Sequence, residues 1–529
     1  MPEVAQRIGR VLAANVAVGP LQLCGAVLAG GGQVGVHRVP FAYGAGIAPR
    51  AGRRREPWCL SPPLRWPAAS VAAVSAPRLA AEIRRSAALA APLVAGHVST
   101  GLISFVDNAI AGRHGTATLA AVAVGTALFW LPLMVPMGTL MAVPPSVSQL
   151  DGAGRRGEIG PLFRQALWLA AALGLLMFLF LTLAPLALAP MGIAPGIVPG
   201  ATDFLHGIRW GVPALTFYFC MRYLAEGLHW TLPTMLLGAL GLVVLVPVGY
   251  ALTFGAVGLP EMGAAGLGYA SSIMLWLQAI TFAFVLQRAP RMRDLRLFGR
   301  FDPPRWRDIR GLLGTGLPIG VTILMEGSLF IVTALLIGRL GEVPAAAHQI
   351  AINVASLCFM VPMGVAEATT VRVGHALGRA DGAGVRRAAL AGYAIVLGTQ
   401  LLSAIVLLAG NETVVSLYTQ DAAVAALAAS LLLYAAAFQF PDGIQVLSAG
   451  ALRGLKDTRV PMGLAAFAYW GIGMPLGATL GLGLAGNAAW GPRGMWLGLI
   501  AGLTVAAVLL GTRLARSSRP ERLAVRMGR

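Results

Sequence analysis

The stretch LWLAAALGLLMFLFLTLAPLALAP, residues 167–190, decides the fold class of this sequence. It contains no Asp, Glu, Lys or Arg. A helix of about 20 apolar residues crosses the hydrocarbon core of a bilayer, so the stretch predicts a membrane-spanning helix. Residues 232–253 form a second uncharged stretch of the same kind.

The composition of the whole chain points to the same solvent. Of 529 residues, 57% are hydrophobic and only 12% are charged, and the mean hydropathy is +0.74. Soluble domains carry roughly 25% charged residues, so this chain lacks the residues for the charged surface of a soluble enzyme. We therefore predict an all-α polytopic membrane protein that is not an enzyme.

Apolar segments and short polar loops alternate from Ser86 to Arg516. A span and its loop take about 35 residues, so about twelve spans fit into this region. The predicted spans are residues 86–110, 117–147, 163–190, 203–222, 232–256, 264–287, 312–337, 344–371, 386–409, 423–451, 459–483 and 493–514.

The spans divide the chain into two predicted lobes. Residues 79–300 hold spans 1–6 and a basic linker, residues 301–516 hold spans 7–12, and residues 517–529 form a basic tail. Residues 1–78 mix Gly, Pro and Arg with short apolar runs, which fits a secretory signal poorly. We expect them to be a disordered or misassigned extension.

Basic loops alternate with arginine-poor loops. Arg155-Arg156, residues 288–310 and residues 453–459 are basic, whereas residues 190–202 and 411–421 are not. The positive-inside rule then places the basic loops and both termini in the cytoplasm. Orientation in a bilayer explains the net charge of +19, and no nucleic-acid partner is needed.

The two halves align without gaps at an offset of 226 residues over their first helix pair. Pro92 falls on Pro318, Gly115 falls on Gly341, and VPMG at 135–138 falls on VPMG at 361–364. Because each half has an even number of spans, both halves have the same orientation in the membrane. A cavity between two such halves is the usual substrate path of a transporter.

Each half also carries an arginine followed by an acid four residues later. These pairs are Arg222 with Glu226 and Arg453 with Asp457. On a helix this spacing places both side chains on one face, so a salt bridge is expected at each, with a structural cap as the alternative reading.

Four acids lie inside apolar segments: Asp107, Glu326, Glu367 and Asp442. An ionised carboxylate in the membrane is costly, and such residues usually face a water-filled cavity on an ion or proton path. Asp107, Glu326 and Asp442 are the candidate coupling residues, and Pro441 is expected to expose a carbonyl beside Asp442. For Glu367, an ion pair with a neighbouring arginine such as Arg372 is an equal alternative.

Weaker candidates for the cavity wall are Gln349, Asn353, Met325 and Phe438. Gln349 and Asn353 are four residues apart and share a helix face, and Met and Phe side chains suit varied aromatic cations. His97 is a possible proton carrier, although ordinary hydrogen bonding is the simpler reading. The sequence holds no phosphate-binding GxxxxGK[ST] motif and no metal-ligand spacing, so we expect no cofactor beyond H⁺ or Na⁺ as coupling ion.

Several strings, in order along the chain, resemble the multidrug and toxic compound extrusion (MATE) family, and its NorM-like subgroup in particular. They are LAAPL at 89–93, FVDNAIAG at 105–112, MEGSLF at 325–330, AAHQIAINVASL at 346–357, RVGHALGRAD at 372–381 and PDGIQVLSAGALRGLKD at 441–457.

This resemblance implies a twelve-helix, two-lobe exporter in the inner membrane of a bacterium that moves organic cations outward while H⁺ or Na⁺ enters. We expect it to act as a monomer. It also implies that Asp107 is the N-lobe carboxylate and that Glu326 and Asp442 are the C-lobe pair, the possible site of Na⁺. The same three residues follow from burial alone.

The sequence departs from the family where oxygen ligands are common. Leu245 and Gly249 stand where relatives often have asparagine, and Phe438 stands where some have tyrosine. Because a hard cation wants several oxygens, these departures favour H⁺ over Na⁺. The alternatives are a flippase for a lipid-linked precursor, which the scarcity of arginine in the spans disfavours, and a membrane subunit without transport activity.

Overall fold

The computed structural model describes residues 76–484 and 488–527, so the predicted N-terminal extension lies almost entirely outside the described residues. The described residues belong to one compact unit, and they form helices without a β-strand among them. Eleven of these helices are long and apolar enough to cross a membrane. The predicted all-α polytopic fold is confirmed.

The N-lobe is built from the helices of the first half. Its long elements are α2 (Ala76–His114), α3 (Thr116–Leu140), α4 (Val143–Gly152), α5 (Ile159–Leu183), α7 (Val198–Ile208), α8 (Val212–Gly227), α9 (Leu232–Phe254) and α10 (Gly263–Arg288). Short helical turns connect them: η1 (Arg156–Glu158), α6 (Pro185–Leu188), η2 (Arg209–Gly211), η3 (Ala256–Gly258) and η4 (Pro290–Leu295).

The C-lobe repeats this plan. It consists of α11 (Trp306–Gly338), α12 (Glu342–Gly378), α13 (Gly382–Ala409), α14 (Asn411–Ser416), α15 (Ala422–Gly454), α16 (Arg459–Ala466), the π-helical η5 (Phe467–Gly473), α17 (Met474–Leu482) and α18 (Pro492–Ser517). A short amphipathic helix, α19 (Pro520–Met527), follows.

The twelve predicted spans all correspond to helices, but their limits differ. The first helix begins at Ala76 instead of residue 86, and the predicted span 117–147 is divided between α3 and α4. The span predicted at 203–222 is the run α7–η2–α8, which is absent from the eleven apolar helices. It carries Arg209 and Arg222, which lower its hydropathy.

The internal repeat is visible in the backbone. Pro92 lies inside α2, and its counterpart Pro318 lies inside α11. Gly115 and Gly341 precede α3 and α12, with φ of 156° and 119° respectively. These φ values favour glycine at both helix junctions.

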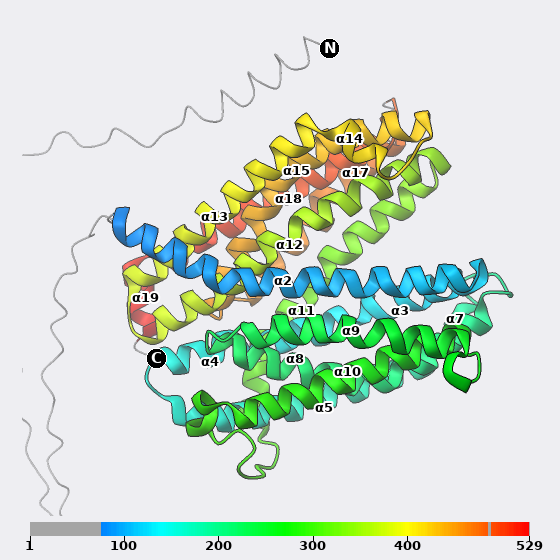
Figure 1. The fold of residues 1–529 in the computed structure, drawn as a ribbon. Coiled ribbons are helices and arrows are strands. Elements are labelled where there is room, and N and C mark those ends of the chain that lie inside the picture. Colours follow the sequence, from blue (N-terminus) through cyan, green and yellow to red (C-terminus); the bar gives the residue numbers. More distant parts are fainter. Residues whose placement is uncertain (1–75, 485–487, 528–529) are drawn as a thin grey trace, which may run out of the picture. The chain divides into compact units, whose positions relative to one another are not determined.

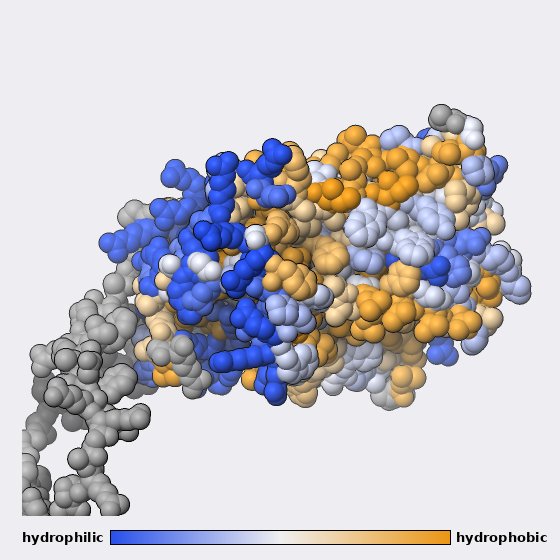
Figure 2. Space-filling view, turned by 90° about the horizontal axis from the view of Figure 1, so that it is seen from below, coloured by the Kyte–Doolittle hydropathy of each residue, from blue (hydrophilic) through white to orange (hydrophobic). Residues whose placement is uncertain are grey.

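The lobes meet at the end of the bundle that carries the basic loops, which we call the basic end. Figure 1 shows the C-lobe helices inclined to the N-lobe helices, so that the two lobes meet near α4 and α19 and diverge toward α7 and α14. Hydrophilic residues gather at the basic end in Figure 2, and apolar residues cover much of the rest. Leu186, Val243 and Leu402 are among the exposed apolar side chains, as expected for a lipid-facing surface.

Glycines allow the backbones of the lobes to touch at the basic end. A Cβ on Gly138 of α3 would overlap Gly320 of α11, and one on Gly152 of α4 would overlap the carbonyl of His375 in α12. Close approach over small residues is the usual mode of helix packing in membranes. The two lobes are therefore in close contact at the basic end. Toward the opposite end Phe105 of α2 and Leu335 of α11 are 69% and 66% exposed.

Candidate functional site

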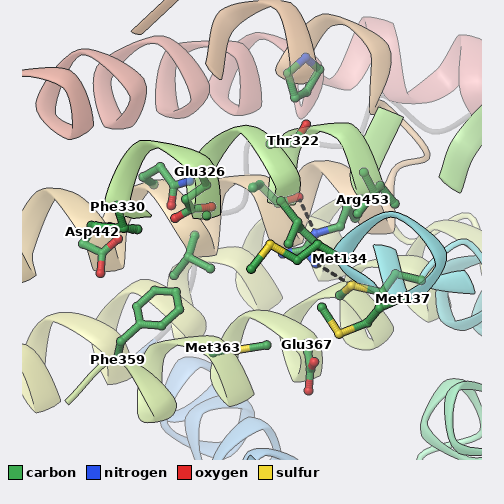
Figure 3. A pocket seen from close by; sticks show the side chains of 18 of the residues that line it. Met134, Met137, Thr322, Glu326, Phe330, Phe359, Met363, Glu367, Asp442 and Arg453 are labelled. Carbon is green, nitrogen blue, oxygen red and sulfur yellow. Dashed lines mark hydrogen bonds between the residues drawn. The ribbon is translucent and has the colours of Figure 1, made fainter. Parts of the chain in front are cut away.

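A cavity of about 440 Å³ lies between the lobes, with most of its wall in the C-lobe (Figure 3). The C-lobe wall comes from α11, α12, α15 and the start of α16. The N-lobe contributes only three methionines: Met134 and Met137 of α3, and Met141 directly after α3. The wall includes the carboxylates Glu326, Glu367, Asp442 and Asp457, the cation Arg453, and the soft or aromatic side chains Met134, Met137, Met141, Met363, Phe330, Phe359 and Phe438.

Glu326 and Asp442 project into the same part of this cavity from α11 and α15 (Figure 3). Asp442 is 3% exposed, and its Oδ1 has no hydrogen-bond partner among the described residues. A buried polar atom without a partner is costly, and it is a place where a cation or a proton gains most. This pair is where the structure could hold a coupling ion. No cluster of three or more His, Cys, Asp or Glu side chains that could hold a metal ion occurs in the described ranges.

Helix α15 runs through Pro441 from Ala422 to Gly454 without an interruption. Proline has no N–H, so within this continuous helix the carbonyl of Ala437, four residues before Pro441, lacks its helical donor. The expectation of an exposed carbonyl beside Asp442 is compatible with this helix and stays a prediction. The nearby carbonyl of Gln439 is occupied, because it accepts a 3.1 Å hydrogen bond from Nε2 of Gln400 on α13.

Asp107 lies in a different pocket, of about 120 Å³, inside the N-lobe. Ser104 and Asn108 of α2 and Ser271 and Gln278 of α10 contribute polar groups to this pocket. One oxygen of Asp107, Oδ1, has no hydrogen-bond partner within the described ranges. The structure thus brings Glu326 and Asp442 together but keeps Asp107 apart from them.

Leu245 and Gly249, at the positions where the family often has asparagine, have apolar surroundings in the structure. Leu245 is fully buried in the N-lobe core, and a Cβ on Gly249 would contact Ile110. Neither residue lines the pocket of Asp107. These two positions therefore add no side-chain oxygen near Asp107, whose pocket is lined by other hydroxyl and amide groups.

The four weaker candidates do not share one position. Phe438 is in the cavity wall, whereas Met325 packs beside the C-lobe core, and its carbonyl accepts a hydrogen bond from Nε1 of Trp470. Gln349 and Asn353 are exposed and joined by a 3.0 Å hydrogen bond, and they lie outside the cavity wall.

A buried ionic cluster joins the lobes near the basic end. A carboxylate oxygen of Glu367 on α12 lies 2.9 Å from Nε2 of His97 on α2 and 3.4 Å from Nη2 of Arg222 on α8. Arg222 also donates to Glu226 at 2.6 Å, so the ion pair predicted for this helix is present. Arg372 does not pair with Glu367, because it binds Glu82 of α2.

The corresponding pair of the C-lobe was predicted wrongly. Asp457 accepts hydrogen bonds from Arg513 and Arg526, and it does not pair with Arg453. Helix α15 ends at Gly454, and Lys456 has a φ of 54°, so the chain turns away before Asp457. The i,i+4 argument requires an uninterrupted helix, which is absent at this point.

Sequence reasoning also missed Gln445 and Tyr469. Nε2 of Gln445 donates to Oη of Tyr469, and Gln445 lines the cavity three residues after Asp442. The i,i+3 spacing on α15 could have suggested Gln445. Tyr469 lies in the π-helical turn η5, which the sequence did not indicate.

Comparison with known proteins gives matches over nearly the whole described region. A family model described as MatE matches residues 92–251 and 318–479, one segment in each lobe. A Xanthomonas campestris pv. campestris protein named Probable multidrug resistance protein NorM is 70% identical over 443 residues, which cover 84% of this chain and 96% of that protein. The Pseudomonas aeruginosa Multidrug resistance protein PmpM is 43% identical and covers 84% and 93%. The crystal structure of the eukaryotic MATE transporter AtDTX14 superposes with a TM-score of 0.75 at 18% identity, over 84% of this chain and 99% of that one.

Proposed function

Because this chain belongs to the MATE family of membrane transporters, we propose that it exports organic cations, drugs among them, in exchange for a coupling ion that enters. Its relatives are transporters and not enzymes. The relatives named above are multidrug resistance proteins, which supports drugs as substrates of this chain as well.

The observation that carries this proposal is the carboxylate-bearing cavity between the lobes. Glu326 and Asp442 supply negative charge, and Phe330, Phe359 and several methionines supply a soft apolar wall (Figure 3). A cation with an aromatic body gains from both, by charge attraction and by contact with ring faces and sulfur. A flippase for an anionic lipid precursor would need a cationic cavity, so these carboxylates disfavour that alternative.

The proposed cycle is alternating access between the lobes. By the positive-inside rule the basic end faces the cytoplasm of a bacterial cell, with the C-terminus there and the N-terminus on the same side. The tight lobe contact at the basic end then corresponds to a state that is closed to the cytoplasm. In this state, entry of a cation or proton at Glu326 and Asp442 weakens their hold on the drug, which leaves outward.

We favour H⁺ over Na⁺ as the coupling ion. A sodium site usually needs several oxygens, and Leu245 and Gly249 add no side-chain oxygen in the N-lobe, while Phe438 adds none beside Asp442. Two carboxylates in a cavity of low polarity can instead accept a proton directly. The transporter is proposed to act as a monomer, since each lobe pair encloses a complete cavity.

Transport into proteoliposomes tests the proposal. Purified protein is reconstituted, ethidium is supplied as the fluorescent cation, and a pH gradient or a Na⁺ gradient is imposed separately. We expect ethidium movement driven by the pH gradient, abolished in Glu326→Gln and Asp442→Asn and retained in Glu412→Gln, a matched change at an exposed acid. Movement driven only by Na⁺ would overturn the choice of ion, and no gradient-driven movement of any cation would overturn the exporter.

A further inference from the structure

Arg453 stands in the last turn of α15 with its guanidinium in the inter-lobe cavity (Figure 3). Its Nη1 lies 3.7 Å from Sδ of Met141 in the N-lobe, and its Nε lies 3.4 Å from the carbonyl oxygen of Ala449. No carboxylate of the described ranges forms an ion pair with it. A guanidinium held by a sulfur and a carbonyl alone remains free to move toward a carboxylate.

Two carboxylates compete for this guanidinium. Glu326 of α11 and Glu367 of α12 line the same cavity, and the charges of both act on Arg453. Glu326 belongs to the cation site with Asp442, whereas Glu367 belongs to the ionic cluster that joins the lobes. Arg453 therefore lies between the proposed cation site and the lobe contact.

Two other titratable groups lie near Arg453: Tyr223 of α8, a phenol that carries no charge at neutral pH, and Asp457 in the cavity wall. Asp457 is engaged through both oxygens by Arg513, Arg526 and Ser517, whereas the hydrogen bonds of Glu367 use Oε2 alone, so Asp457 is the weaker competitor. Glu326 and Glu367 are therefore the two carboxylates that compete for Arg453.

Two side chains of the N-lobe contact Glu367 of the C-lobe. His97 and Arg222 both contact the same oxygen of Glu367, Oε2. A guanidinium from the C-lobe that turned to Glu367 would neutralise the carboxylate to which the N-lobe binds. The attraction between the lobes at this point would then fall.

We propose that Arg453 is the positioning residue that couples the cation site to the lobe contact. While Glu326 is ionised, it attracts Arg453 away from Glu367, and His97 and Arg222 of the N-lobe stay bound to Glu367. When a proton or cation neutralises Glu326 and Asp442, Glu367 remains as the ionised carboxylate of the cavity that attracts Arg453, and Arg453 turns to it and displaces Arg222 and His97. The basic end then opens, so this inference rests on the proposed function and names the residue that links ion entry to opening.

A buried serine at the lobe contact supplies a reporter of opening. Ser148 of α4 is fully buried and lies against Gly374 of α12. Ser148→Cys, in full-length protein whose four native cysteines are alanine, presents a thiol that a membrane-impermeant maleimide reaches only after the basic end opens. The rate of labelling in inverted vesicles measures that opening.

In this reporter background, Glu326→Gln mimics the neutralised site. We expect it to raise the labelling rate by a factor on the order of 5 to 150, the usual range of coupling between two sites. Adding Arg453→Gln to Glu326→Gln should return the rate to that of the unmodified reporter, and Arg453→Lys, which keeps the charge, should not. Arg459→Gln removes an exposed arginine outside the cavity and serves as the matched control.

Fast labelling that persists in the Glu326→Gln, Arg453→Gln protein would overturn the inference and leave the exporter intact. If Glu326→Gln changes neither labelling nor ethidium transport, the proposed function itself fails, so the two failures are distinguishable. Should Arg453→Gln not fold by size-exclusion chromatography, Arg453→Met supplies a neutral side chain of similar length, with the same two outcomes.

Discussion

Arg372 of α12 forms an ion pair with Glu82 of α2 through both its Nε and its Nη2. Its Nη2 lies 2.6 Å and 2.8 Å from the two carboxylate oxygens, and its Nε lies 2.8 Å from one of them. Both side chains are largely buried, at 20% and 11% exposed. The pair connects the first helix of the N-lobe to the C-lobe and so stabilises the closed basic end.

Removing one member of this pair should favour opening. Hydrogen bonds to charged groups contribute about 1.5–3 kcal/mol, so Glu82→Gln is expected to raise labelling of Ser148→Cys by roughly tenfold or more. The double variant Glu82→Gln, Arg372→Gln should open less than Glu82→Gln alone, since no unpaired arginine is left in the contact. Equal rates in the unmodified reporter and both variants would exclude a stabilising role for the pair.

Gly316 offers a steric test of the lobe contact. A Cβ at this position would overlap the carbonyl oxygen of Thr139 on α3, across the interface. Gly316→Ala is therefore expected to prevent closure of the basic end and to abolish ethidium export while the protein still folds, because each lobe keeps its own core. Gly311→Ala on the same helix, where a Cβ meets nothing within 4 Å, is the control and should transport normally. Normal transport by Gly316→Ala would show that the lobes need not pack this closely.

Asp442→Asn should separate function from stability. The carboxylate is buried, and one of its oxygens is unpaired among the described residues, so its charge lowers the free energy of unfolding. A role in ion coupling would explain why the chain keeps such a destabilising group. We expect the variant to lose gradient-driven export and to unfold about 1 °C higher, equivalent to a gain near 1 kcal/mol for a chain of this size. Lower thermal stability together with intact export would assign Asp442 a structural role.

Hydropathy and burial were enough to predict the helices and the three candidate carboxylates. Apolar runs have the length that a bilayer demands, and an acid within such a run needs a reason to be there. Asp107, Glu326 and Asp442 stand out in this way without any tertiary information. That Asp107 occupies its own pocket could not be foreseen, because it depends on how α2 packs against α9 and α10.

The ionic contacts were harder to predict, since they depend on helix ends and on distant partners. Arg222 and Glu226 pair because α8 continues to Gly227, whereas Arg453 and Asp457 do not because α15 stops at Gly454. Glu367 finds His97, 270 residues away, in preference to Arg372 on its own helix. Arg372 is five residues further along, where a helix has turned to another face.

The linker between the lobes should unfold locally in acid. Nε of Arg164 donates to Asp302 at 2.6 Å, and this hydrogen bond lowers the pKa of Asp302 below its usual value. A lowered folded-state pKa adds stability that is present above the ordinary aspartate pKa of about 3.9 and is lost as the pH falls through the lower value. The difference in melting temperature between unmodified protein and Asp302→Asn should be constant from about pH 7.5 to 5 and shrink progressively as the pH falls below about 4. A difference that grows in acid would contradict this assignment.

The methionine wall should set the range of substrates. Met134, Met137 and the following Met141 are the N-lobe's whole contribution to the cavity wall in the described structure, and they face the aromatic side chains of the C-lobe. A flexible thioether adapts to different aromatic cations, whereas a β-branched residue of similar volume has one preferred χ1 and cannot. Met137→Ile is therefore expected to weaken binding of bulky cations more than that of small ones, so that the ratio of their Kd values changes while the transport of a well-fitting cation persists. Fluorescence titration with a series of cations of increasing size measures this ratio, with Met191→Ile at an exposed position as the control. A uniform loss across the series would instead mean that Met137 contributes general packing, because only a side chain in contact with the substrate can distinguish substrates by shape.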